Sequence, residues 1–147
     1  MKDAFGGIMS LVFIAIFLVI IEGILGFIVS YSKAFRMKNA IISYVEQYEG
    51  AGCFSGSGGN GTCQKKILES AQRFGYSPPN LKCPRGDNWG MDSQKLFCYS
   101  KRDSDSGNNN VYSIVTQVDI NIPIITNIMG ISFFQVHGDT KPVKKNK

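Results

Sequence analysis

Several residue types that carry chemistry are scarce in this chain of 147 residues. Its one histidine, His137, is accompanied by no serine or cysteine nucleophile motif, so a Ser-His-Asp or Cys-His catalytic arrangement is unsupported. The glycine-rich stretch 54–61 lacks the lysine and hydroxyl pattern of a phosphate-binding loop. We therefore expect a protein that is not an enzyme and that requires no metal or other cofactor.

Charge is also sparse, at 18% of the residues, with a net charge of +5. Three of the 16 cationic residues lie in the last four positions, and three more lie between Lys33 and Lys38. This distribution gives no broad basic face, so no nucleic-acid partner is predicted. Cations that flank an apolar segment more often serve a lipid interface, which makes membrane lipid the expected partner.

The length of the chain excludes a multidomain enzyme.

The apolar residues are concentrated near the N-terminus. The run from Ile8 to Ile28 has one charge in 21 residues, and as an α-helix it would be about 31 Å long, enough to span a bilayer. A cleaved secretory signal is the alternative, but the run exceeds the roughly 7 to 15 residues of a signal's apolar region. We therefore expect a retained transmembrane helix within residues 1–31.

Glu22 needs an explanation, because a carboxylate deep in hydrocarbon costs on the order of 2.5 to 3.5 kcal/mol. Either it lies near the headgroups, or it meets a polar group on a neighbouring helix. Gly26 and Ser30 form a small-xxx-small pair beside it, which allows close helix approach. Glu22, Gly26 and Ser30 are therefore the candidate subunit-contact residues.

A second periodic pattern follows the apolar run. Apolar and aromatic residues recur at spacings of three and four, which predicts that the same helix continues as an amphipathic segment. We expect the helix to end near Glu49, before the glycines at 50 and 52. The residues of this stripe are Ala34, Met37, Ile41, Tyr44 and Tyr48.

The four cysteines, Cys53, Cys63, Cys83 and Cys98, all follow the apolar run. No two are separated by the two to four residues typical of a zinc pair, so two disulfides are favoured over a four-thiolate zinc site. Cys53–Cys63 and Cys83–Cys98 are the preferred pairs because each closes a short loop, although the other connectivities stay open. Disulfides require an oxidising exterior, whereas the cations after the apolar run favour a cytoplasmic C-terminal part. The charge bias is small, so we give the cysteines precedence.

Residues 32–147 are predicted to form an extracytoplasmic α+β domain that includes the amphipathic helix continuation. A short helix is expected over 63–74 and strands over 95–101, 111–122 and 131–137, with one buried face on the second strand. The sole tryptophan, Trp89, is expected as a core anchor, with a binding-surface role as the alternative. The predicted fold is α+β: a long N-terminal transmembrane and amphipathic helix packed on a small antiparallel sheet, with a short second helix and disulfides.

An apolar N-terminal helix containing Ile20 to Gly23, the stretch from Ala40 to Gly50 and a closing hairpin within 111–140 together resemble bacterial type IV pilin-like proteins. The TadE-like pseudopilins of tight-adherence (Tad) pili are the most similar group. The resemblance implies a cytoplasmic N-terminus, an exterior head and assembly through the helix. It also implies leader cleavage at Gly7, but Val12 stands where the family's glutamate would fall, so processing stays open.

These observations favour a membrane-anchored, pseudopilin-like structural subunit of a type IV or Tad-type pilus or secretion apparatus, located at the cell surface. Its partners would be homo- or hetero-oligomeric pilin-like subunits. The alternative is a single-pass membrane protein whose extracellular head binds a ligand or partner without polymerising.

Overall fold

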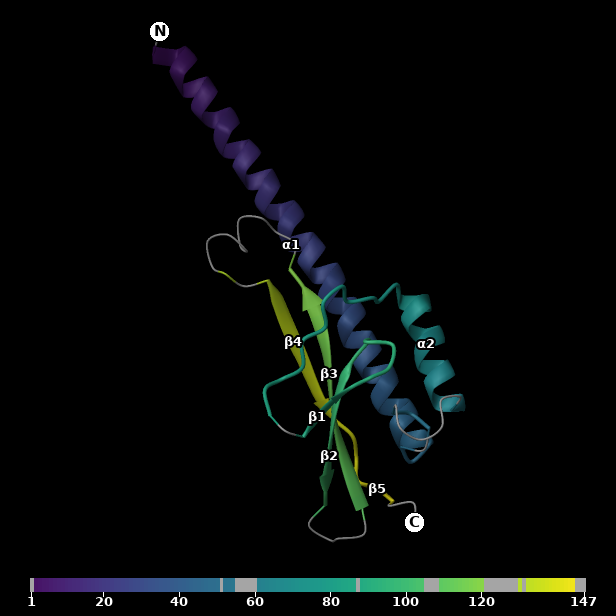
Figure 1. Cartoon of the computed structure of the whole chain (residues 1–147). Coiled ribbons are helices and arrows are strands. Elements are labelled where there is room, and N and C mark those ends of the chain that lie inside the picture. Colours follow the sequence, from purple (N-terminus) through teal and green to yellow (C-terminus); the bar gives the residue numbers. More distant parts are fainter. Residues whose placement is uncertain are drawn as a thin grey trace.

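The structure, a computed structural model, describes residues 2–50, 52–54, 61–86, 88–104, 109–120, 130 and 132–144. One long helix projects from a small head in which a second helix and an antiparallel sheet pack on its lower half (Figure 1). The α+β class, the two helices and the antiparallel sheet agree with the prediction. The elements are α1 (Lys2–Gln47), α2 (Thr62–Phe74), β1 (Trp89–Met91), β2 (Cys98–Asp103), β3 (Asn109–Asp119), β4 (Phe133–Asp139) and β5 (Val143–Lys144).

Helix α1 is continuous through both the apolar and the amphipathic segment, over 46 residues. It begins at Lys2, earlier than the apolar run, and therefore includes Gly7, the proposed cleavage position. The chain leaves the helix through positive φ angles at Glu49 (50°) and Gly50 (75°). The backbone N–H of Gly50 donates to the carbonyl of Val45 at 2.9 Å, which closes the last turn.

The sheet has the order β1-β2-β3-β4, all antiparallel, and β5 pairs with the start of β3. The expected meander of three strands is present, but the strands span Cys98–Asp103, Asn109–Asp119 and Phe133–Asp139 instead of 95–101, 111–122 and 131–137; positions 121, 122 and 131 lie outside the described residues. The first strand begins at Cys98 rather than at residue 95, because Lys95 has a positive φ of 55° and donates its N–H to the carbonyl of Asp92 in a turn. Strands β1 and β5, with three and two residues, were not predicted.

The lower half of α1 is the central element of the core. The side chains of Ala34, Met37 and Ile41 are 0% exposed, as the amphipathic periodicity predicted. Tyr44 and Tyr48 of the predicted stripe are half-buried, and Val45, which was not predicted, is 0% exposed. The four fully buried side chains pack on the inner face of β3, where the Thr116 hydroxyl donates to the carbonyl oxygen of Ala34 at 3.1 Å. Helix α2 packs on the same core through its apolar face, which contains Cys63, Ile67 and Ala71.

Strand β3 is buried on both faces, so the prediction of one buried face was wrong. The chain between α2 and β1 lies across the outer face of the sheet. There the Gln117 side chain accepts from the backbone N–H of Lys82 at 2.8 Å and donates to the carbonyl of Asn80 at 2.8 Å. Beyond the first residue of β2, the Tyr76 hydroxyl donates to the Gln117 carbonyl at 3.1 Å and accepts from the Gln117 N–H at 2.9 Å. Burial raises the pKa of this hydroxyl.

The cysteines form two disulfides, Cys53–Cys63 and Cys83–Cys98, which is the pairing that the sequence favoured. The first joins the turn after α1 to the first turn of α2. The second fastens the outer-face segment to β2 beside Val115, which pairs with Cys98 in the ladder. Each therefore holds an irregular segment against a regular element.

Candidate functional site

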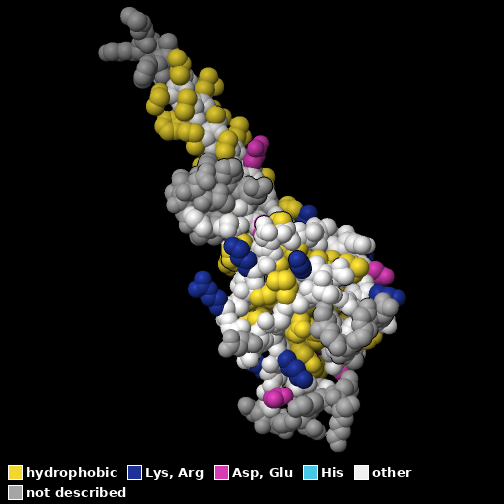
Figure 2. All heavy atoms as spheres, in the orientation of Figure 1, with side chains coloured by type: hydrophobic (Ala, Val, Ile, Leu, Met, Phe, Trp, Pro, Cys, Tyr) yellow, Lys and Arg dark blue, Asp and Glu magenta, His cyan; other side chains and the backbone are white. Residues whose placement is uncertain are grey.

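Over Ile8 to Ile21, the side chains of α1 are not covered by the part of the chain that the structure describes. All large apolar side chains from Ile8 to Ile21 are between 36% and 68% exposed, and Figure 2 shows this segment as a rod covered with hydrophobic side chains. Water does not stabilise a helix that is apolar all round, and such a helix is normally found in a protein core or a membrane. By length and composition α1 can cross a membrane.

The three candidate contact residues lie on one face of this helix, one turn apart. Glu22 and Gly26 are exposed, whereas Ser30 is half-buried near the head. Together they line a hollow of about 200 Å³ that Asp119 and Ile120 close at the end of β3. No ion pair joins Glu22 to any cation of the described residues. A Cβ at Gly26 would meet none of their atoms within 4 Å. Glu22 and Gly26 are thus the exposed residues of this face, and they share the hollow with Asp119 and Ile120 of the same chain.

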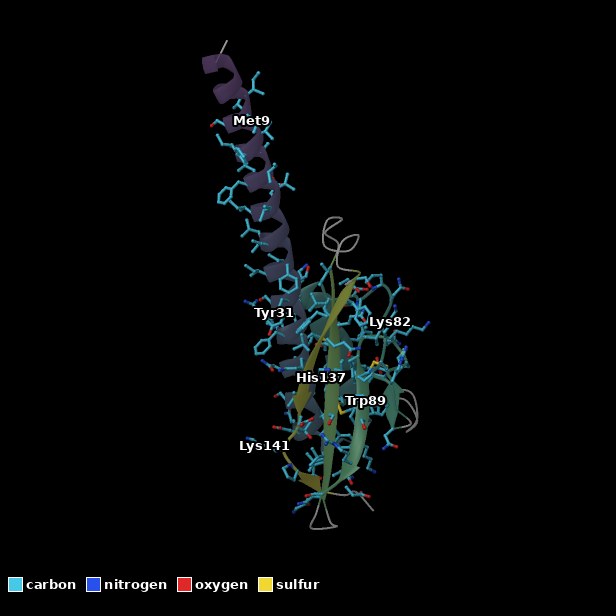
Figure 3. All side chains as sticks on the ribbon, turned by 90° about the vertical axis from the view of Figure 1, so that its left-hand side faces the viewer. Met9, Tyr31, Lys82, Trp89, His137 and Lys141 are labelled. Carbon is cyan, nitrogen blue, oxygen red and sulfur yellow. A yellow bond between two sulfur atoms is a disulfide. The ribbon has the colours of Figure 1, made fainter. Side chains whose placement is uncertain are left out.

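An aromatic stripe marks the junction between the rod and the head, where Figure 3 shows Tyr31. The rings of Phe27, Tyr31 and Phe35 follow one another at spacings of four residues, with centroids 6.2 Å apart at each step. Tyr31 also lies 6.4 Å from the ring of Phe134 on β4, and the Lys38 ammonium lies 4.5 Å from the centroid of Phe35. Amphipathic aromatic rings are enriched at membrane–water interfaces. This stripe escaped the sequence reasoning, although its four-residue spacing directly after the apolar run was a readable signal.

The outer face of the sheet carries a cleft of about 430 Å³, and Figure 3 labels two of the residues that line it, Trp89 and His137. Its floor contains Ser100 and Ser113, which are paired on the two middle strands and are 5% and 7% exposed. Because these side chains are small, the rings of Trp89 and His137 reach over them and meet edge to face, with centroids 6.3 Å apart. Trp89 is half-buried here and lies outside the core, so the core-anchor prediction was wrong.

Polar groups border the cleft. The Arg102 guanidinium donates to the Ser113 hydroxyl at 2.6 Å and pairs with the Asp139 carboxylate at 3.3 Å. This ion pair is more than half exposed, so it contributes at most about 1 kcal/mol. Within the described residues no hydrogen bond connects His137 to Ser113, and no group of three metal-ligating side chains is found. The lining of the cleft thus combines an aromatic ring with hydrogen-bonding groups.

No protein-family model, curated protein or solved structure matches this chain.

Proposed function

We propose that the protein is a membrane-anchored, pseudopilin-like structural subunit that assembles through its N-terminal helix. One contrast within α1 carries the proposal. The side chains of Met37, Ile41 and Val45 are 0% exposed against the head, whereas every large apolar side chain from Ile8 to Ile21 is at least 36% exposed. A single rigid helix thus joins a folded head to a segment whose preferred solvent is lipid or the helices of other subunits.

The two disulfides set the proposed orientation. Disulfides persist in oxidising compartments and are rare in the cytosol. Both bridges hold irregular segments of the head, Cys53–Cys63 beside the end of α1 and Cys83–Cys98 across the sheet. The head is therefore assigned to the exterior and the start of α1 to the cytoplasmic side.

Glu22 and Gly26 form the proposed contact. An isolated carboxylate at this depth costs on the order of 2.5 to 3.5 kcal/mol, and a polar group from a neighbouring subunit would offset that cost. No atom of the described residues lies within 4 Å of a Cβ built at Gly26, and a glycine at this position favours the close approach of a second helix.

Disulfide cross-linking in membranes tests this contact. Val19 lies on the same helical face as Glu22 and Gly26, and Ile24 lies on the opposite face; their side chains are 54% and 53% exposed. We expect Val19→Cys to form a covalent dimer on oxidation and the matched control Ile24→Cys to form little. Adding Glu22→Ala to Val19→Cys should reduce the dimer while the chain stays in the membrane fraction. Ala34 and Met37 are unsuitable for such probes because both are buried in the head.

The alternative function, a single-pass receptor with a ligand-binding head, is favoured by the cleft between Trp89 and His137. It predicts that neither Val19→Cys nor Ile24→Cys forms a dimer. It also predicts that a small polar ligand quenches or shifts the fluorescence of the sole tryptophan.

Equal cross-linking of both cysteine variants, or cross-linking unaffected by Glu22→Ala, would count against Glu22 as a subunit contact.

A further inference from the structure

A basic groove lies between the two helices at the foot of the apolar rod. It has a volume of about 390 Å³ and is lined by Lys33 and Arg36 of α1 and Arg73 of α2, over an apolar floor that includes Ile28, Val29 and Phe74. The three cationic side chains are exposed. We propose that this groove binds the headgroup of an anionic phospholipid, an inference that rests on the membrane anchoring proposed above.

The groove is lined by three cations and by no carboxylate. The Asp119 carboxylate lines an adjoining hollow together with Lys33. The Lys33 ammonium also reaches the C-terminal end of α2, within 3.7 Å of where a Cβ of Gly75 would lie. The groove therefore collects three cationic side chains from two helices over a lining without a carboxylate, which favours an anionic ligand.

The position of the groove directly after the apolar run favours a lipid as its ligand. Residues Ile8 to Ile28 fill about 31 Å of helix, which matches the hydrocarbon core, and each headgroup layer adds roughly 5 to 8 Å. Lys33 and Arg36 follow Ile28 by about 7.5 Å and 12 Å along the axis. Because helical side chains tilt toward the N-terminus, both cations point back toward the bilayer.

Two further features agree with this depth. The aromatic stripe of Phe27, Tyr31 and Phe35 lies at the same level of α1. The floor residues Ile28 and Val29 are 54% and 55% exposed and continue the apolar surface of the rod into the groove. A headgroup phosphate bound by the cations would therefore leave its acyl chains against the rod.

The test measures lipid retention by native mass spectrometry of the full chain, titrated in micelles with phosphatidylglycerol or phosphatidylcholine. Wild-type protein should retain phosphatidylglycerol preferentially, and the preference should fall as salt is raised. Each cation should contribute about fivefold to the binding of an anionic lipid. The ratio of phosphatidylglycerol to phosphatidylcholine retained should therefore be at least about tenfold lower for the Lys33→Gln/Arg36→Gln/Arg73→Gln variant than for wild type. The matched control Lys65→Gln/Lys101→Gln/Lys144→Gln removes the same charge from exposed positions elsewhere and should keep it.

A wild-type chain without preference, or a groove variant that keeps the full preference, would overturn the assignment. If the groove substitutions abolished the cross-linking of Val19→Cys but left the lipid preference unchanged, the groove would bind a neighbouring copy of the chain and not a lipid. Extraction of membranes at alkaline pH separates the two proposals: a chain released by this treatment contradicts the anchoring itself, whereas an inserted chain without lipid preference contradicts only the groove.

Discussion

The same substitution, isoleucine to alanine, should destabilise the head at one position of α1 and leave its stability nearly unchanged at another. Ile41 is 0% exposed and packs in the core, whereas Ile16 is 51% exposed on the rod. Removing a buried isoleucine side chain to alanine costs about 2 to 5 kcal/mol through lost burial and the cavity left behind. For a head of this size each kcal/mol lowers Tm by roughly 4 to 8 °C. We therefore expect Ile41→Ala to lower Tm by at least about 8 °C.

The matched variant Ile16→Ala removes the same atoms without opening a cavity in the head, so its effect should stay within about 0.5 kcal/mol. Thermal unfolding of the full chain in detergent micelles, with the disulfides intact, measures both variants through near-ultraviolet circular dichroism. Equal losses of Tm would refute the division of α1 into a membrane half and a core half, and so would a larger loss for Ile16→Ala.

Three further predictions concern the head. Replacing both Cys53 and Cys63 with alanine frees a loop of sequence separation 10 and should lower the free energy of unfolding by about 2 to 3 kcal/mol in thermal melts; an unchanged Tm would contradict this. A Cβ at Gly138 would lie 2.8 Å from the Cδ1 of Ile42, so Gly138→Val should cost about 1 to 3 kcal/mol by the same assay and Gly138→Ala less; a neutral valine would mean that α1 does not press on β4 there. Burial raises the pKa of Asp92 above 3.8, so the folded protein binds the proton of this carboxyl more tightly than the unfolded chain does. The stability that the protonated carboxyl contributes is therefore lost as pH rises through the folded pKa. Asp92→Asn should accordingly gain stability relative to wild type between about pH 3 and pH 7, and a pH-independent difference would contradict the assignment.

Local periodicity and loop length were sufficient to predict much of the fold. The three- and four-residue spacing of Ala34, Met37 and Ile41 identified the buried face of α1, because an amphipathic helix carries its own pattern. The pairing of the cysteines followed from the short loops that they close. Both signals are local in the sequence.

What escaped prediction depends on contacts between distant segments. Strands β1 and β5 are too short to show a period, and they exist because β2 and β3 offer them an edge. Gln117 looks like a solvent-facing residue of an alternating strand, yet its side chain is bonded to the segment around Lys82. The basic groove needs Arg73 beside Arg36, and these residues belong to different helices.

The topology of the chain in a cell membrane tests the central claim most directly. The measurement adds a protease outside intact spheroplasts of a bacterial host and follows the full-length chain after alkaline extraction. We predict that the chain stays in the membrane pellet and that the protease digests the head without lysis. Release of the chain by alkaline extraction, or a head that is cut only after the membrane is lysed, would contradict a lipid-embedded helix with an exterior head.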